Sequence, residues 1–309
     1  MSSGLSAQRI VTLLPSATEI VCAVGLRDQL VGVTHECDFP SDVPSLPSVT
    51  RSAIDHSLTS SEIDAAVREH LQDNRALYTL DVPLLQRLQP DLIVTQALCD
   101  VCAVSEDEVT SVLQLLPGPP RLINLEPMSL PEVFDTISLV GHTAGVDEVA
   151  ECYRASLESR VQSVIERSAQ IPQNEKPTVG FLEWTDPLFN GGHWTPELID
   201  YAGGIDSFGN PHQPSQTLSD ETLLAADPDV LVIALCGFDE QRAQHELSVL
   251  KQRIDFTQLK AHREGRVYVL DGNSYFSRPG PRLVDALEIL AHLLHPGDHP
   301  GGQSAAGSE

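Results

Sequence analysis

The sequence contains neither a long apolar segment nor a recognisable export signal. No run of about 18 apolar residues occurs in the 309-residue chain, so a membrane-spanning helix is not expected. Residues 1–8 are rich in serine, and the first apolar run, which starts at Ile10, stops at Pro15. Because a secretory signal needs a basic start followed by an apolar stretch, we expect a cytoplasmic protein.

Basic residues are few and acidic residues are many. The 19 Lys and Arg residues, of which three are lysine, stand against 44 Asp and Glu residues, which gives a formal net charge of −25. A chain with this charge repels other polyanions. Nucleic acid and anionic membrane surfaces are therefore poor candidates for the main partner.

Signature motifs of common enzyme classes are also missing. The sequence has no G-x-S-x-G, no P-loop, no G-x-G-x-x-G and no H-E-x-x-H. Glu183 and Asp186 are close enough in sequence to pair as acid and base, but neither comes with a nucleophile or an assigned metal. The sequence therefore predicts a binding protein and not an enzyme.

Two related halves of alternating strands and helices are present. A short helix, Pro-Asp and a buried strand follow one another in Leu84–Val94 and again in Leu223–Val232. Between them, Asp147–Ala169 has helical spacing without Gly or Pro, and at about 1.5 Å per residue it would span about 35 Å. This pattern predicts an α/β fold of two lobes with parallel sheets. The predicted parts are an N-terminal lobe (1–145), a connecting helix (146–172), a C-terminal lobe (173–296) and a disordered tail (297–309).

Two predicted helices begin with capping signals. Ser16, with Glu19 three residues later, is a capping box for a helix over Ala17–Val24. Thr195 is expected to cap a helix over Pro196–Tyr201, where proline in the first turn suits a helix start. Each signal predicts the residue at which its helix begins.

Large aromatic side chains fall on loops at the carboxyl ends of predicted strands. Trp184 and Trp194 lie in one such loop, and Tyr275 and Phe276 lie in another. Ligands of open parallel sheets collect at these strand ends. Because flat side chains outside the core periodicity favour a ligand with a broad apolar face, the sequence predicts a ligand cleft.

The order of several motifs resembles a known family. The segment Leu14-Pro-Ser-Ala-Thr-Glu19, the paired Pro-Asp-strand units, the long middle helix and the closing Phe276-x-Arg278-x-x-Pro281-Arg282 are similar to the substrate-binding proteins of ABC importers for cobalamin and iron siderophores. The likeness is greatest to the cobalamin-binding branch and covers about residues 9 to 295. It implies two Rossmann-like lobes of the class III periplasmic-binding-protein type, joined by a single long helix and clasping the ligand between them.

The resemblance implies that the ligand is a corrinoid, above all cobalamin. In that family an aromatic-lined cleft holds the corrin ring, which here implies aromatic contacts from Trp184, Trp194 and Tyr275. The implied ligand-binding residues are Pro15, Ser16, Glu183, Trp184, His193, Trp194, Tyr275 and Arg278. The alternative is an iron-siderophore or haem-binding protein of an ABC importer. Under this alternative the protein is periplasmic, and its export signal lies before the first residue of the given sequence.

The family also docks on a permease through one glutamate of each lobe. The matching positions are Glu106 and Glu221, each shortly after a serine near a helix start. The alternative is that these acids only favour the helix dipole. Because family members that feed importers are exported, a permease is an expected partner only if this chain is exported too.

Three cysteines depart from the family pattern. Cys99 and Cys102 form a C-x-x-C, Cys37 is expected at the end of a neighbouring strand, and His193 is expected to face them. These side chains could bind zinc, copper(I) or an iron–sulfur centre. Alternatively, the cysteines could form a redox pair, or a thiolate or imidazole could coordinate a corrinoid cobalt. A cytoplasmic metal or redox protein is therefore a second alternative function. The other possibility is that the three thiols are inert.

The other cysteines are expected to be small buried hydrophobes: Cys22, Cys152 and Cys236.

His193 follows two glycines and precedes a tryptophan. Gly191-Gly192 allows the backbone to approach a ligand closely, and an imidazole there could coordinate cobalt or donate to a propionamide. The alternative is that His193 only caps the helix that follows.

Overall fold

The computed structural model describes residues 7–55, 57–73, 76–96, 109, 112–299 and 307–308. The chain divides into two compact units. The N-terminal unit comprises Met1–Leu58, Ala65–Pro127 and Pro131–Ser156, and the C-terminal unit comprises Thr59–Asp64, Met128–Leu130 and Leu157–Glu309. No helix among the described residues combines the length and the apolar character needed to cross a membrane.

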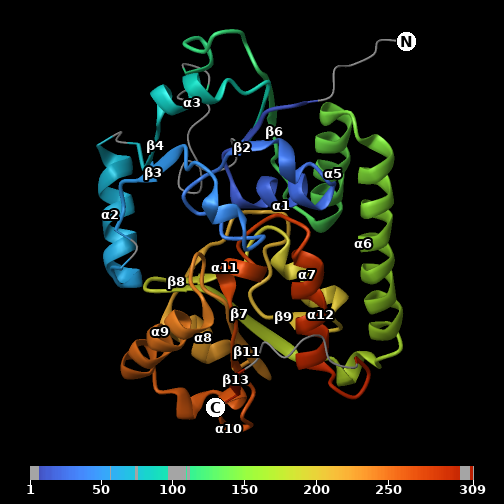
Figure 1. Ribbon diagram of the computed structural model, residues 1–309. Coiled ribbons are helices and arrows are strands. Elements are labelled where there is room, and N and C mark those ends of the chain that lie inside the picture. The colour runs from blue at the N-terminus through green and yellow to red at the C-terminus, as the bar shows by residue number, and fades with distance from the viewer. Residues whose placement is uncertain are drawn as a thin grey trace. The chain divides into compact units, whose positions relative to one another are not determined.

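The N-terminal unit is built on a four-stranded parallel sheet in the order β2-β1-β5-β6. Figure 1 labels its edge strands β2 and β6. Its strands are β1 (Ile10–Thr12), β2 (Leu30–Gly32), β5 (Leu92–Thr95) and β6 (Arg121–Asn124). The two central strands, β1 and β5, are buried along their whole length. Such apolar runs, buried on both faces, are typical of parallel sheets, as the sequence predicted.

Helices and a small strand pair complete the N-terminal unit. The strands β3 (Thr50–Ser52) and β4 (Tyr78–Leu80) pair antiparallel. Side chains of Val11, Ile93 and Leu85 belong to one buried cluster, which joins the sheet to a helix. The helices are α1 (Pro15–Ala23), α2 (Ser60–Gln72), α3 (Val82–Leu88) and α5 (Leu130–Ala144), with 3-10 turns at Arg27–Gln29 and Val43–Ser45. The first residues of α2, 60–64, and Leu130 of α5 belong to the C-terminal unit.

The C-terminal unit has a seven-stranded mixed sheet around β7 (Thr178–Thr185). The strands β11 (Val230–Ile233), β12 (Val267–Val269) and β9 (Ile205–Asp206) extend the parallel part. The antiparallel additions β8 (Leu188–Asn190), β10 (Thr217–Leu218) and β13 (Gly307–Ser308) were not predicted. The predicted α/β class with parallel sheets is therefore confirmed, and the C-terminal sheet carries these antiparallel strands in addition.

The long helix α6 (Asp147–Ser168) has 22 residues, which correspond to about 33 Å. It is the longest described helix (Figure 1). The division between the units falls inside it, between Ser156 and Leu157. Its second half is fixed to α12 because Arg160 bonds both Asp285 and Glu288. The other helices of the C-terminal unit are α7 (Thr195–Tyr201), α8 (Asp220–Ala226), α9 (Glu240–Arg253), α10 (Lys260–Arg263), α11 (Gly272–Tyr275) and α12 (Leu283–Leu294), with 3-10 turns at Gln173–Glu175 and Phe256–Gln258.

The repeated Pro-Asp segments have the same structure in both units. The helices α3 and α8 end at residues in the left-handed region, Gln89 with φ 46° and Asp227 with φ 39°. After the proline, Asp91 accepts hydrogen bonds from the backbone N–H groups of residues 8 and 9, just before β1. In the same way, Asp229 accepts from the N–H of Thr178, where β7 begins. The predicted internal repeat is confirmed.

Residues 297–299, which the sequence assigned to the tail, are among those the structure describes. His299 is buried, and its imidazole lies 3.3 Å from the hydroxyl of Ser168 at the end of α6. Its carbonyl oxygen is 2.7 Å from Nδ1 of His292 on α12. These contacts tie the chain after α12 to the C-terminal unit.

Candidate functional site

The loops that follow β7, β11 and β12 meet at one edge of the C-terminal sheet. Because these strands are parallel, their carboxyl ends lie together. The N–H of Cys236, just after β11, donates to the carbonyl oxygen of Glu183 over 3.0 Å. The N–H of Asn273, after β12, donates to the carbonyl oxygen of Phe238 over 3.0 Å. The end of β7, which carries Glu183 and Trp184, and the segment that carries Tyr275 therefore lie at one edge. Trp184 is in the strand and not in the loop that the sequence predicted.

Glu183 lies on β7 with its carboxylate turned to two other segments. Its Oε2 accepts from the N–H of Gly192 over 3.2 Å, and it also bonds the Ser215 side chain. Burial raises the pKa of the Glu183 carboxyl, and these two bonds lower it by less. Ser215 was not predicted, because it comes from a connecting segment without a recognisable motif.

The glycine beside His193 is required by the chain itself. A Cβ built on Gly192 would lie 2.4 Å from the backbone nitrogen of Ser215. The close approach that the sequence predicted for a ligand is thus made by another loop of the same unit. This corrects the interpretation of Gly191-Gly192.

His193 is held in a left-handed conformation, with φ 52°. Its N–H donates to the carbonyl oxygen of Gln213 over 2.7 Å, and its carbonyl oxygen accepts from the N–H of His212 over 2.9 Å. The imidazole is half-buried beside the indole of Trp194, with 5.3 Å between ring centroids. Burial lowers the pKa of His193, so the site favours a neutral imidazole.

The helix after His193 begins differently from the prediction. The N-cap of α7 is Trp194, whose indole can only donate and cannot accept a hydrogen bond from the helix. Thr195 is already helical, so it is not the cap that the sequence predicted. His193 precedes the N-cap, and its role as a cap is also excluded.

Both tryptophans contribute to the packing of the C-terminal unit. Trp194 is 7% exposed, and its Nε1 donates to the carbonyl oxygen of Phe276 over 2.9 Å. Trp184 is half-buried, donates to the carbonyl oxygen of Asp186, and packs on Phe238 with 5.2 Å between ring centroids. Trp184 thus retains an accessible face, whereas Trp194 has little left. Ligand contact by either side chain stays a prediction.

Tyr275 and Arg278 lie on the loop that begins with α11. Asp271 caps this helix by accepting from the N–H of Ser274 over 2.7 Å. Tyr275 is half-buried, while Arg278 is 8% exposed and donates from Nη2 to Oδ1 of Asn273 over 2.9 Å. Asp271 and Asn273 thus hold the loop that carries Tyr275 and Arg278. The sequence analysis did not identify either of these two supporting residues.

The N-terminal unit carries the predicted residues Pro15 and Ser16 directly after β1. Pro15 is the first residue of α1, and its N-cap is Leu14, which has no side-chain acceptor. Ser16 is helical and buried, so the predicted capping box with Glu19 is wrong. A proline in the first turn starts this helix instead, because its missing N–H needs no partner there.

Cys37 is buried after β2, among hydroxyl groups. Its Sγ lies 3.0 Å from Oγ1 of Thr18, which is itself 2.6 Å from Oγ1 of Thr12. No group of three or more His, Cys, Asp or Glu side chains arranged to hold a metal occurs among the residues that the structure describes. Cys99, Cys102 and Glu106 lie outside those residues, so their predicted roles stay predictions.

The remaining cysteines divide into two kinds. Cys22 is partly buried, and burial raises the pKa of its thiol to about 11. Cys152 and Cys236 are exposed, which contradicts the prediction that they are small core residues. Cys152 faces outward on α6, and Cys236 lies in the turn after β11, beyond the buried part of that strand.

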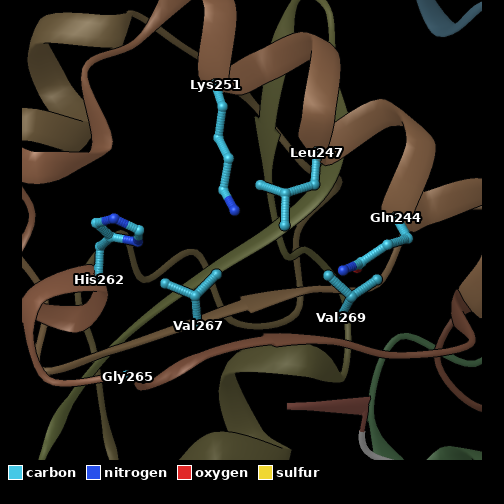
Figure 2. Close-up of a pocket in the computed structure, with 7 residues that line it drawn as sticks. All are labelled: Gln244, Leu247, Lys251, His262, Gly265, Val267 and Val269. Carbon is cyan, nitrogen blue, oxygen red and sulfur yellow. The ribbon is translucent and has the colours of Figure 1, made fainter. Parts of the chain in front are cut away.

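A pocket of about 150 Å³ lies elsewhere in the C-terminal unit, between α9 and β12. Figure 2 shows Lys251, Gln244 and Leu247 of α9 above the valines of β12. Ligand sites for molecules of drug size have volumes of roughly 300–1,000 Å³. This pocket is therefore too small for a macrocycle.

The comparison with known families supports the fold and the broad role. The sequence profile of the family described as periplasmic binding protein matches residues 10–273. The chain belongs to the periplasmic binding protein family. The predicted family resemblance and the fold class are thereby confirmed, and a role in binding a small substrate follows from family membership.

Individual periplasmic binding proteins similar to this chain bind different ligands. An uncharacterized ABC transporter substrate-binding lipoprotein of Bacillus subtilis, YvrC, is 24% identical over 94% of this chain and 80% of its own length. A vitamin B12-binding protein of Vibrio cholerae is 24% identical over 95% of this chain and 91% of its own. A solved periplasmic haem-binding protein of Pseudomonas aeruginosa is 21% identical with a TM-score of 0.73 over 98% of both chains. The fold therefore does not select the ligand.

Glu221, the predicted docking residue of the C-terminal unit, is exposed in the first turn of α8. A backbone N–H and the Ser219 hydroxyl bond its carboxylate and lower its pKa. Ser219 is the N-cap and accepts from the N–H of Thr222 over 3.2 Å. These contacts give Glu221 a local role at the helix start, and docking on a permease stays a prediction.

Proposed function

We propose that this periplasmic binding protein binds a corrinoid, with cobalamin as the main candidate, and performs no chemistry on it. The observation that carries the proposal is the composition of the carboxyl edge of the C-terminal sheet. Half-buried Trp184 lies at the end of β7 next to Glu183, and half-buried His193 and Tyr275 lie on the segments that follow. Flat side chains suit a macrocycle, and polar groups between them suit its substituents.

The electrostatics of this edge favour an uncharged polar ligand. Burial raises the pKa of Glu183 and lowers that of His193, so both groups are biased toward their neutral forms. A corrin ring carries neutral carboxamide side chains, whereas haem carries propionates and many siderophores are anionic. The formal net charge of −25 adds a long-range penalty for an anion. A corrinoid therefore fits better than haem.

The role of the neutral polar groups follows from their hydrogen-bonding capacity. A neutral imidazole offers one donor and one acceptor, and so does a protonated carboxyl. Either can pair with a carboxamide, which itself has an N–H donor and a carbonyl acceptor. A vitamin B12-binding protein among the relatives supports this choice of ligand class.

The test is a titration of the full chain with cyanocobalamin and, separately, with haemin, followed by calorimetry and visible absorbance. We expect one equivalent of cobalamin to bind with a Kd below about 10 μM, and haemin to bind more weakly. No cobalamin binding at about 100 μM would reject the proposal. Metal analysis of anaerobically purified protein tests the alternative of a metal or redox protein, which predicts stoichiometric zinc or iron.

A matched pair of variants localises the binding. Tyr275→Ala removes an accessible ring from the proposed edge, and Tyr201→Phe alters a tyrosine on α7 whose hydroxyl bonds Glu197. We expect the first change to weaken cobalamin binding by about tenfold, which corresponds to the contribution of one stacked aromatic group. The second is expected to leave the affinity unchanged. Equal effects of the two changes would contradict this location.

A further inference from the structure

Two neighbouring residues at the carboxyl edge of the N-terminal sheet each carry an unpaired polar atom. Thr95 and Asn124 are the last residues of β5 and β6, and they are partners in the strand register. Thr95 is 1% exposed. Among the residues that the structure describes, its Oγ1 and the Oδ1 of Asn124 are buried without a hydrogen-bond partner.

The fold itself does not require these polar atoms. The backbone at this edge is already paired, since the carbonyl oxygen of Thr95 accepts from the N–H of Leu125 over 2.8 Å. Valine has the shape of threonine and is equally suited to a strand. An unpaired buried polar atom normally destabilises a protein, and native structures contain few of them. Two on neighbouring strands therefore indicate a hydrogen-bond partner that is not among the described residues.

The position of the pair indicates what kind of partner this is. Open parallel sheets bind ligands beyond the carboxyl ends of their strands, next to the point where the strand order reverses. In the order β2-β1-β5-β6 this point lies between β1 and β5, and Thr95 ends β5. The unpaired atoms are thus at the edge where the N-terminal unit would meet a ligand.

We propose that Thr95 and Asn124 form a subsite for a primary carboxamide of the ligand. The amide NH₂ donates to Oδ1 of Asn124, and the amide carbonyl accepts from the hydroxyl of Thr95. A carboxylate has no donor for Asn124 and would bring a negative charge against its carbonyl oxygen. The subsite therefore selects the carboxamides of a corrinoid against the propionates of haem.

This inference rests on the proposed function, and its test uses cobalamin as the probe. Thr95→Val and Asn124→Leu remove the polar atoms with little change in volume. Thr95→Ser keeps the hydroxyl and serves as the conservative rescue. Ser207→Ala is the matched control, because Ser207 also has a buried unpaired hydroxyl but lies beside Val179, near the start of β7.

We expect Thr95→Val and Asn124→Leu each to raise Tm and to weaken cobalamin binding by about five- to tenfold, the range of one ordinary hydrogen bond. Thr95→Ser should bind like the parent chain, and Ser207→Ala should raise Tm without any change in affinity. A cobalamin derivative with a carboxamide hydrolysed to a carboxylate at this subsite should bind the parent chain more weakly, and Asn124→Leu should reduce that difference.

The outcomes separate this inference from the proposed function. If the parent chain binds cobalamin and Thr95→Val raises Tm without weakening binding, the unpaired atoms serve no ligand and the subsite is refuted. If the parent chain binds no cobalamin, the proposed function fails, and the subsite for a corrinoid fails with it. Thr95→Val preserves the shape of the side chain, and both its Tm and its affinity are measured. The test therefore does not depend on Asn124→Leu, even if that variant folds poorly.

Discussion

The carboxylate of Glu183 accepts a hydrogen bond from the N–H of Gly192, with 3.2 Å between Oε2 and the nitrogen. This bond and the one from Ser215 only partly offset burial, which raises the pKa of the carboxyl above its ordinary value of 4.5. The folded state therefore holds this proton more tightly than the unfolded state does. The carboxyl favours folding below pH 4.5, and this contribution is lost as the pH rises through the folded pKa.

Glu183→Gln removes this titration while keeping an oxygen for Gly192. We expect the variant to gain stability relative to the parent chain as the pH is raised from about 4 to 8, in urea unfolding measured at several pH values. Glu221→Gln is the control, and it should lose stability relative to the parent chain as the pH rises. Hydrogen bonds lower the pKa of Glu221, so its carboxylate stabilises the folded protein above pH 4.5. If the difference in unfolding free energy between the parent chain and Glu183→Gln does not change with pH, the assignment is wrong.

His193 gives a second pH dependence. Burial lowers its pKa, so protonation at low pH favours the unfolded state, and stability is lost as the pH falls from 6.5 through the folded pKa. His193→Asn keeps a residue that tolerates φ 52° but removes the imidazole. We expect this variant to lose less stability than the parent chain between pH 7 and 5. Titration of the His193 ring by NMR at or above pH 6.5 would refute this account.

Trp194→Phe tests the link between the two loops of the C-terminal edge. The change removes the donor that bonds the carbonyl oxygen of Phe276 and leaves that oxygen buried without it. We expect a loss of about 1–2 kcal/mol in the free energy of unfolding, measured by chemical denaturation. Trp184→Phe is the matched change at a half-buried indole, and it should cost less. The reverse order would contradict the structural role given to Trp194.

Glu246 on α9 provides the sharpest stability prediction. Its buried carboxylate accepts from the Ser60 hydroxyl over 2.6 Å and from the Thr185 hydroxyl over 3.3 Å. Glu246→Ala leaves both hydroxyl groups without this partner and should lower the free energy of unfolding by about 2–3 kcal/mol. His245→Ala, at the exposed neighbouring position, should have little effect. Equal losses in the two variants would show that the network contributes nothing specific.

Much of the fold could be predicted because its strands are short apolar runs bounded by clear signals. The Pro-Asp pairs locate β5 and β11, because each aspartate accepts hydrogen bonds at the start of a neighbouring strand. The helix α9 was missed. Its inward face includes Glu246, so it lacks the apolar periodicity that identifies an amphipathic helix.

The site could be predicted less completely, for a physical reason. Sequence shows that Trp194 follows a strand, but it does not show that its indole turns inward to bond Phe276. The same limit applies to Gly192, whose missing side chain makes room for Ser215. Thr95 and Asn124 were also missed, because strand ends with polar side chains are common and only the register shows that these two are neighbours.

The most direct test of the account is the identity of the small molecule that the protein carries when it is purified from its own cells. Visible absorbance and mass spectrometry of the material released on unfolding identify that molecule without any assumption about affinity. The account predicts a corrinoid spectrum at up to one equivalent per chain, and cobalamin uptake by any protein purified empty. A Soret band from haem, or an iron siderophore in the released material, would contradict it.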